Sequence, residues 1–285
     1  MQSTEDLKKI ASQVRRDIIR MVVKANSGHP GGSMSSADFM TALYFNVMEH
    51  DPATWTREGK DQDMFILSAG HLTPMYYSIL SRAGYFPTSE LGSFRKFGSR
   101  LQGHPSVRKG LPGVAQAAGS LGQGLSVAAG AALAKKADND PHNVFVLCGD
   151  GETEEGQIWE AAMWAGHRKL DNLVVIVDNN GLQIDGKVED VCSVYPIDAK
   201  FEAFNFQAIN VDGHNFDEIR AAMEKARETK GKPTAIIMHT IKGKGVSFME
   251  NNAGWHGKAP NDEEYAIAMA DLDKIAADLE KAGEV

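Results

Sequence analysis

The chain has 285 residues, of which 42% are hydrophobic and 24% are charged, a composition typical of a folded globular protein rather than a disordered or fibrous one. Its formal net charge of −8 is spread without a long block of like charges, which argues against nucleic acid as a partner. Two cysteines provide no disulfide framework and fit a reducing compartment, so we expect a cytoplasmic protein.

The termini and the apolar stretches bear on processing and domain organisation. No apolar stretch approaches the roughly 18 residues that a membrane span needs, and the N-terminal segment lacks the pattern of a targeting peptide. We therefore expect no membrane partner. The start at Met1 and the polar, helix-like end favour a natural subunit over an expressed fragment, and residues 1–285 are expected to form a single domain.

The first predicted element is an amphipathic helix. Apolar residues recur at three- and four-residue spacing over residues 7–25, and Ser3 with Asp6 is the expected cap. Glycine and proline in the segment 27–31 predict the end of this helix. A second helix is expected to begin near residues 35–36.

Five short apolar runs follow, and helix-like stretches such as 157–170 and 217–228 lie between them. Some runs are apolar at nearly every position, as is typical of parallel strands that are buried on both faces. The alternation predicts an α/β fold with three layers, in which helices cover a mostly parallel sheet. The predicted strands are Met64–Leu67, Val144–Cys148, Leu173–Val177, Phe206–Val211 and Thr234–Met238.

Two further segments have other patterns. The stretch Tyr85–Gly124 is rich in glycine and proline, lacks sustained periodicity and is interpreted as a long functional loop. The tail from Asn261 onward has helical spacing and is either a last crossover helix or the start of a linker.

Polar residues follow two of the predicted strands. Asp150 lies between two glycines after one strand, and Asn180 precedes a glycine after the next. In open α/β sheets ligands gather at the carboxyl ends of the strands, and one strand–helix–strand unit separates these two residues. Each motif alone is more typical of an ordinary turn, but together they predict a site for Mg²⁺ or Ca²⁺ with phosphate oxygens.

A third glycine cluster, Gly119–Gly124, leads directly into a predicted helix over residues 125–134. A helix N-terminus approached by glycines is a site suited to anions. The spacing matches neither the dinucleotide fingerprint nor the P-loop. Tight helix packing would explain these glycines equally well.

Six segments, taken in chain order, resemble the N-terminal domain of transketolases over residues 10–260. The Gly-Asp-Gly to Asn-Asn element is the general motif of thiamine-diphosphate enzymes, whereas the histidine-bearing segments are far more specific to transketolases. The segments are Ser27–Gly31, Phe65–His71, Gly103–Pro105, Gly119–Gly124, Gly149–Gly151 and Asp178–Gly186.

The resemblance implies a site for thiamine diphosphate and a divalent metal, Mg²⁺ or alternatively Ca²⁺ or Mn²⁺. The implied metal ligands are Asp150, the Asn180 side chain and the Leu182 carbonyl. The implied cofactor-binding residues are His71, Gly119, Ser120, Leu121, Gly151, Asn180 and His256, together with Glu155 and Glu160, which match acidic residues near the subunit interface.

The resemblance also implies catalytic histidines. His29, His104 and His256 match the histidines that line the substrate channel. Imidazole suits this place because ketol transfer moves protons at sugar oxygens near neutral pH. The remaining histidines have no such context and are expected to be structural; they are His50, His142, His167, His214 and His239.

The basic run Lys242–Gly245 follows the last predicted strand. Its two lysines could offer charge to a phosphorylated substrate. We interpret the run instead as a solvated loop.

The activity implied by the resemblance is transfer of a two-carbon ketol unit from a ketose phosphate to an aldose phosphate in the pentose phosphate pathway. The family's catalytic glutamate and its pocket for the cofactor's pyrimidine ring belong to a second domain, which this chain lacks. We therefore expect that the chain is inactive alone, that its partner is a C-terminal transketolase subunit, and that two such pairs form a heterotetramer.

Three alternatives remain. A fragment of a deoxyxylulose-phosphate synthase or the α subunit of a 2-oxo acid dehydrogenase would share the metal motif. Neither is expected to share Ser27–Gly31 and Gly103–Pro105 as a set. The third alternative is a non-catalytic regulatory subunit that binds the cofactor, against which the four motif histidines argue.

Overall fold

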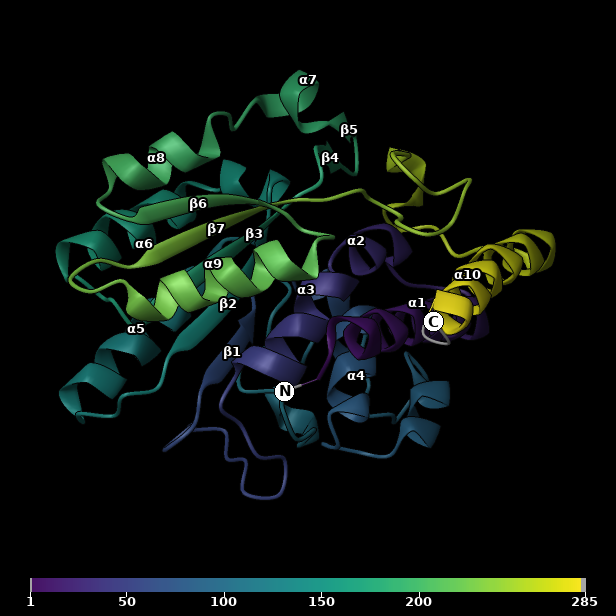
Figure 1. Cartoon of the computed structure of the whole chain (residues 1–285), viewed down its shortest axis with the longest axis horizontal. Coiled ribbons are helices and arrows are strands. Elements are labelled where there is room, and N and C mark those ends of the chain that lie inside the picture. Colours follow the sequence, from purple (N-terminus) through teal and green to yellow (C-terminus); the bar gives the residue numbers. More distant parts are fainter. Residues whose placement is uncertain (1, 283–285) are drawn as a thin grey trace.

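The computed structural model describes residues 2–282. Its centre is a parallel sheet of five strands in the order β1-β2-β3-β7-β6 (Figure 1). Each predicted apolar run forms one of these strands, so the predicted sheet is confirmed. The strands are β1 (Met64–Leu67), β2 (Val144–Gly149), β3 (Leu173–Asn179), β6 (Gln207–Asp212) and β7 (Thr234–His239).

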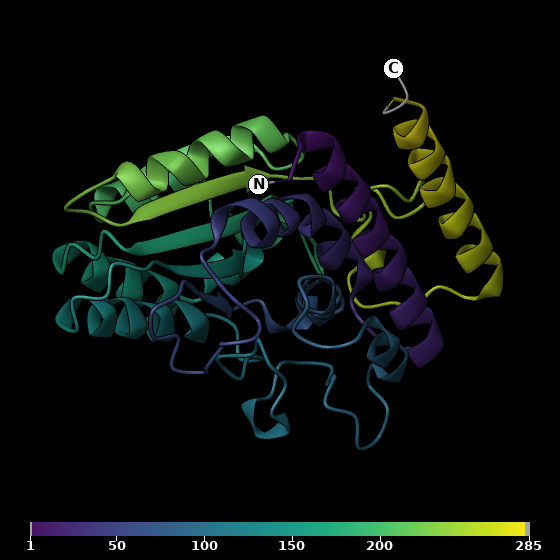
Figure 2. The same cartoon turned by 60° about the horizontal axis from the view of Figure 1, so that its bottom comes forward.

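Helices cover both faces of the sheet and complete the predicted three layers (Figures 1 and 2). One face carries α5 (Gln123–Ala137), α6 (Gly156–His167), α7 (Val188–Cys192) and α8 (Ile197–Ala203). The other carries α1 (Thr4–Ala25), α3 (Ala37–Ala42), α4 (Thr73–Arg82) and α9 (Phe216–Glu228). Within the described residues, no helix is both long and apolar enough to cross a membrane.

Strand β2 has a continuous apolar run because each face of the strand is buried against a different core. In β2, Phe145 and Leu147 pack in the core that includes α1, α3 and α4, whereas Val144, Val146 and Cys148 pack against α5 and α6. All five side chains are fully buried. Successive strand residues point to opposite faces, so two cores require a continuous apolar run.

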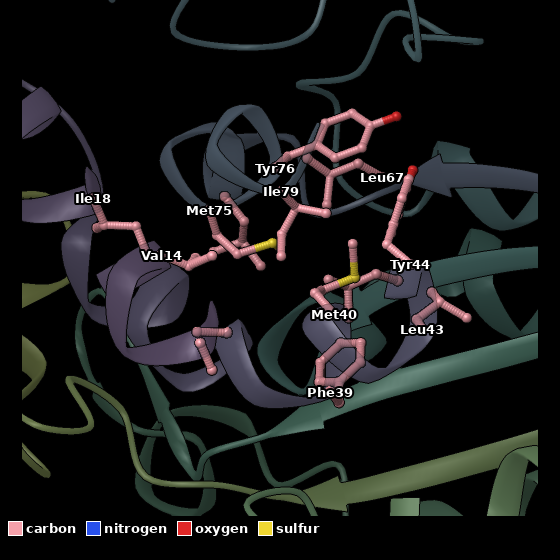
Figure 3. Packing of buried hydrophobic residues seen from close by; sticks show 14 of the residues in the cluster. Val14, Ile18, Phe39, Met40, Leu43, Tyr44, Leu67, Met75, Tyr76 and Ile79 are labelled. Atoms are coloured by element: carbon pink, nitrogen blue, oxygen red, sulfur yellow. The ribbon is translucent and has the colours of Figure 1, made fainter. Parts of the chain in front are cut away.

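The core on the α1 side is built by helices that interdigitate through apolar residues (Figure 3). Val14 and Ile18 of α1 face Met75 and Ile79 of α4, and Phe39 of α3 extends the cluster towards the sheet. These residues are fully buried. The three- and four-residue spacing along α1 therefore reflects one apolar stripe against this core.

The start of α1 confirms the predicted cap, because the Ser3 side chain accepts from the Asp6 N–H and the Asp6 carboxylate accepts from the Ser3 N–H. A short helix that was not predicted, α2 (Pro30–Ser35), comes next. Proline stands at its first turn, where its missing N–H costs nothing and its fixed φ suits a helix. Helix α3 then begins after its N-cap residue Ser36, so the helix predicted to begin near residues 35–36 is confirmed.

The predicted long loop is largely irregular and contains only the short 3₁₀ turns η3 (Thr88–Ser93) and η4 (Val107–Lys109). A small hairpin of β4 (Leu182–Gln183) and β5 (Gly186–Lys187) was not predicted. The tail forms α10 (Asp262–Ala282), which packs along α1 (Figure 2) through its buried residues Ala268 and Leu272. The predicted tail beyond residue 282 lies outside the described residues.

A buried ion pair joins α1 to α3. The Arg15 guanidinium donates twice to the Asp38 carboxylate, at 2.8 and 2.7 Å, and His214 Nδ1 lies 2.7 Å from the same carboxylate. His214 Nε2 accepts from the Ile241 N–H, so it has the expected structural role. Burial alone would raise the pKa of Asp38, but Arg15 and His214 outweigh it and lower this pKa to about 2.

Replacing Asp38 by asparagine is expected to lower the free energy of unfolding at pH 7 by about 3 kcal/mol, because Arg15 loses its charged partner in a buried site. The folded-state pKa lies below its ordinary value, so this stabilisation is present above about pH 4 and is lost as pH falls towards 2. Urea unfolding at several pH values measures the difference.

The matched control is Asp217→Asn, which breaks an exposed pair with Arg220 and should change the free energy of unfolding by less than about 1 kcal/mol. The stabilising role of Asp38 would be contradicted if both variants lost the same free energy of unfolding. It would also be contradicted if the loss in Asp38→Asn persisted at pH 2.

Candidate functional site

Three strands that lie side by side end at one edge of the sheet. Gly149 of β2 is level with Asp178 of β3, which is level with Met238 of β7. The residues that follow these strand ends therefore converge. They line a cavity of about 140 Å³, together with residues of α2 and the loop before α5. The cavity is lined by Gly32, Ala69, His71, Leu72, Leu121, Gly149, Asp150, Gly151, Glu152, Asp178, Asn180, Leu182, Gln183, Ile184, Lys242 and His256.

Asp150 lines this cavity and is only 2% exposed. Its carboxylate accepts from the Gly151 N–H at 2.7 Å and from the Gly181 N–H at 2.5 Å. Burial, followed by the nearby charge of Asp178, raises the pKa of Asp150 to about 7. A carboxylate in this position favours a nearby cation, because a positive charge would offset its cost of burial.

Asn180 is oriented by Asp178. The Asn180 amide donates from Nδ2 to Asp178 at 3.1 Å, so its oxygen Oδ1 points the other way and accepts from the Leu182 N–H. Asp178 is itself held by the hydroxyl groups of Ser35, Ser36 and Thr240. The amide oxygen is therefore presented as a ligand by a buried and fully bonded carboxylate.

Lys242 corrects one interpretation of the sequence. The side chain is 2% exposed and its ammonium donates to the Leu182 carbonyl at 2.9 Å. Its aliphatic stem packs on Gly31, where an added Cβ would lie 3.1 Å from Lys242 Cγ. Lys242 therefore belongs to the cavity and does not lie in a solvated loop. Burial lowers its pKa, and the charges of Asp150 and Asp178 oppose that shift.

The donor set fits a hard divalent cation. Asp150, Asn180 and Leu182 offer one carboxylate, one amide oxygen and one backbone carbonyl, all lining the same cavity. Mg²⁺ and Ca²⁺ take such oxygen ligands, and Mg²⁺ commonly completes its shell with phosphate and water. Among residues 2–282 no group of three or more His, Cys, Asp or Glu side chains could hold a metal, so a metal here would depend on the amide and carbonyl oxygens as well as on Asp150.

The glycine cluster before α5 is pinned by Glu152. This buried carboxylate accepts from the Ser68 hydroxyl, from the Gly122 N–H at 2.8 Å and from the Gly149 N–H at 3.0 Å. Gly124 lies directly against Ser68, which leaves no room for a side chain there. The cluster is thus fastened to the ends of β1 and β2, and its member Leu121 reaches the cavity.

Four histidines from distant segments come together beside the cavity. The ring of His29 lies 5.3 Å from that of His71, 6.3 Å from that of His104 and 5.5 Å from that of His256, measured between centroids. The rings of His71 and His256 are 5.0 Å apart. His71 and His256 line the cavity, whereas His29 and His104 lie next to them along the cluster.

The environment keeps these imidazoles neutral. Burial is the main cause that lowers the pKa of each ring, to about 4 for His29 and about 3 for His256. The pKa values of His71 and His104 are lowered as well, with nearby positive charge and other histidines contributing. At neutral pH each ring therefore carries one N–H donor and one acceptor nitrogen, which suits binding of sugar hydroxyl groups.

Some predicted cofactor residues lie outside the cavity. Gly119 packs between Gly70 and the His104 ring, and Ser120 is exposed nearby. Glu155 and Glu160 are exposed at the start and along the side of α6. Within this chain, the geometry favours a surface role for the two glutamates over contact with the cofactor.

Sequence reasoning missed several residues of the site. Three of them follow predicted strands, at the edge of the sheet where ligands gather: Glu152, Asp178 and Lys242. Their position after a strand is the signal that could have identified them. Arg95, which contacts His29, lies in the irregular loop and had no comparable signal.

Comparisons with known proteins show the family to which the chain belongs. The family model for the transketolase thiamine diphosphate binding domain matches residues 7–273. The chain belongs to the transketolase family. Its thiamine-diphosphate binding domain is therefore shown by the family match, and the predicted resemblance is confirmed.

Two relatives of this transketolase-family chain are subunits of similar length. It is 40% identical to the 6-deoxy-6-sulfo-D-fructose transketolase subunit SqwG of Clostridium sp. (strain MSTE9), over 95% of this chain and 98% of that protein. It is 39% identical to an apulose-4-phosphate transketolase subunit of Actinobacillus succinogenes, over 95% of this chain and 97% of that protein.

Among solved structures, the transketolase from Campylobacter jejuni superposes with a TM-score of 0.85 at 32% identity. All of this transketolase-family chain is covered, but only 48% of that one. The chain thus spans about half the length of this larger relative. The α/β fold is the one predicted.

Proposed function

We propose that this chain is the N-terminal subunit of a transketolase, which transfers a two-carbon ketol unit from a ketose phosphate to an aldose phosphate. The observation that carries the proposal is the cavity in which Asp150, Asn180 and Leu182 adjoin a cluster of neutral histidines. The likeness to subunits of the same length supports it. A role in the pentose phosphate pathway and a cytoplasmic location belong to this proposal.

Thiamine diphosphate with Mg²⁺ is the proposed cofactor, and when bound it would supply the carbanion chemistry at the sugar carbonyl. The chain's share is to hold the diphosphate end. Asp150, Asn180 and the Leu182 carbonyl would bind the metal, and Lys242 would contribute positive charge towards the diphosphate. His71, Gly151 and Leu121 line the same cavity and would contact the cofactor.

The substrate channel is assigned to His29, His104 and His256. Their rings are neutral because burial lowers each pKa, so they would bind hydroxyl and carbonyl oxygens without bringing charge into the channel. Neutral imidazole can both donate and accept a hydrogen bond. The three imidazole rings would thereby orient the sugar and transfer protons to and from its oxygens.

A C-terminal partner subunit is proposed to complete the site with the catalytic glutamate, the pyrimidine pocket and a further domain. An exposed apolar surface on α5 and α6, which includes Val127, Met163 and Trp164, supports this docking. Leu121, which lines the cavity, is exposed just before α5, and Glu155 and Glu160 are exposed on α6. Two such pairs would form a heterotetramer.

The choice of sugar is tested with purified complex, thiamine diphosphate and Mg²⁺. Transfer from xylulose 5-phosphate to ribose 5-phosphate is compared with transfer from 6-deoxy-6-sulfofructose, the sugar in the name of one relative. Faster transfer from xylulose 5-phosphate supports ketose phosphates as the substrate class. Faster transfer from 6-deoxy-6-sulfofructose would replace them with sulfonated sugars. If a bound partner gives transfer from neither ketose, nor from apulose 4-phosphate, the sugar in the name of another relative, the transketolase proposal fails in favour of a regulatory subunit.

A further inference from the structure

A guanidinium lies against the histidine cluster, outside the cavity. Arg95 follows η3, and its Nη1 donates to the Ser27 hydroxyl at 2.8 Å, while its Nη2 faces His29 Nδ1 at 3.5 Å. Both partners belong to the short segment between α1 and α2. One side chain of the long loop thus reaches back to the segment that carries His29.

Neighbouring residues pack against this guanidinium and hold it in place. Phe94, itself 2% exposed, places its ring centroid 5.6 Å from Arg95 Cζ. On another side lies Gly103, where an added Cβ would come within 2.7 Å of the same carbon. The guanidinium therefore packs on the backbone immediately before His104, and only glycine leaves space for it.

The backbone of Arg95 has a φ of +57°, a left-handed conformation that residues with side chains rarely adopt. Its Nε is buried and has no hydrogen-bond partner among the described residues. Both features cost free energy in the folded state, and such costs are found where a side chain must be held in a particular place.

The chemistry of the two side chains restricts the state of His29. Arginine stays protonated and offers only N–H donors, so the imidazole nitrogen that faces it must carry a lone pair. The facing atom is Nδ1, and the proton of the neutral ring is then on Nε2. A protonated ring would turn an N–H towards the guanidinium.

We propose that Arg95 is a positioning residue that fixes His29 as the neutral tautomer with its proton on Nε2, so that this N–H is free to bind a sugar oxygen. The sugar oxygen rests on the proposed function, whereas the tautomer rests on the contacts of this chain alone. Arg95 would act through His29 and also brace the segment of His104.

The charges around His29 agree with this assignment. Burial is the first cause of its low pKa, and the positive charge of Arg95 is the second. His104 and Lys242 lower this pKa further. The titratable groups that face His29 are Arg95, His71, His104, His256 and Lys242.

Long-range ¹H–¹⁵N NMR of the full chain, labelled at histidine, tests the proposal, because ring ¹⁵N shifts distinguish the two tautomers. The His29 signals are assigned by their loss in His29→Gln. We expect the proton on Nε2 and no titration between pH 5.5 and 8.5. A wild-type His29 with its proton on Nδ1 would overturn the proposal.

Two variants sharpen the test. Arg95→Met should give a mixture of tautomers and raise the His29 pKa, because a nearby positive charge is lost. Arg100→Met removes an arginine that pairs with Glu90 in the same loop and should leave His29 unchanged. A single His29 tautomer in Arg95→Met, equal to that of the wild type, would overturn the proposal.

If Arg95→Met does not fold, as judged by circular dichroism, Ser27→Ala takes its place. This variant removes the anchor of the guanidinium while keeping its charge, and a tautomer mixture is again expected. An unchanged tautomer in Ser27→Ala would count against the proposal. Because the readout needs neither partner nor turnover, its failure is distinct from failure of the proposed function.

Discussion

Replacement of Asp150 by alanine is expected to abolish ketol transfer by the complex of this chain with its partner. The variant should also bind thiamine diphosphate and Mg²⁺ at least about 100-fold more weakly, since loss of even an indirect metal partner costs about 10- to 100-fold. Asp150 is the one carboxylate of the proposed metal ligands, and it holds the Gly181 turn as well. Calorimetric titration of the complex measures the affinity.

Two further variants separate loss of charge from loss of fold. Asp150→Asn keeps the size of the side chain and a hydrogen-bonding oxygen but not the negative charge, so it should lose most of the same affinity. Asp138→Ala removes an exposed carboxylate at the end of α5 and should behave as the wild type. Retention of metal affinity in Asp150→Asn would contradict the assignment of Asp150 as a charged ligand.

Replacement of Lys242 by methionine is the second variant with a large expected effect. The complex should bind thiamine diphosphate about 30-fold or more weakly, because truncating one partner of a buried charge pair costs about 2–5 kcal/mol. Lys242 is the buried cation of the cavity, next to Asp150 and the Leu182 carbonyl. Methionine preserves the length and most of the apolar stem that packs on Gly31.

Lys244 provides a matched control from the same basic run. Its ammonium lies 3.9 Å from Glu250 at the surface, and both side chains are 36% exposed. Lys244→Met should therefore change cofactor affinity by no more than about twofold. If both lysine variants lost cofactor affinity to a similar extent, the basic run would act only through its overall positive charge. That result would contradict a specific role for the buried Lys242.

The sheet and the main helices could be predicted because their signals are local. Buried strands such as β2 need apolar residues on both faces, and α1 needs one apolar stripe and a cap, so a short window of sequence contains the pattern. The short helix α2 was missed because Pro30 was taken only as the end of α1, although proline also suits the first turn of a helix. Strands of two residues, as in β4 and β5, leave no periodic pattern.

Site residues could be predicted where they follow a strand or lie in a recognisable motif. They could not be predicted where their role depends on contacts between distant segments. Burial of Lys242 depends on Gly31 and Leu182, which lie far away in the sequence, so a glycine-rich basic run gave no sign of it. Arg95 likewise contacts His29, which lies 66 residues away in the sequence. The metal ligands and the catalytic histidines stay predictions, now supported by their shared location.

The most direct test is a titration of a fixed amount of the C-terminal partner with this chain, followed by the rate of ketol transfer with thiamine diphosphate and Mg²⁺ present. Neither chain alone should give transfer, and the rate should rise with added chain and stop rising at one equivalent. Transfer by this chain alone would contradict the claim that it holds only the metal and diphosphate half of a shared site.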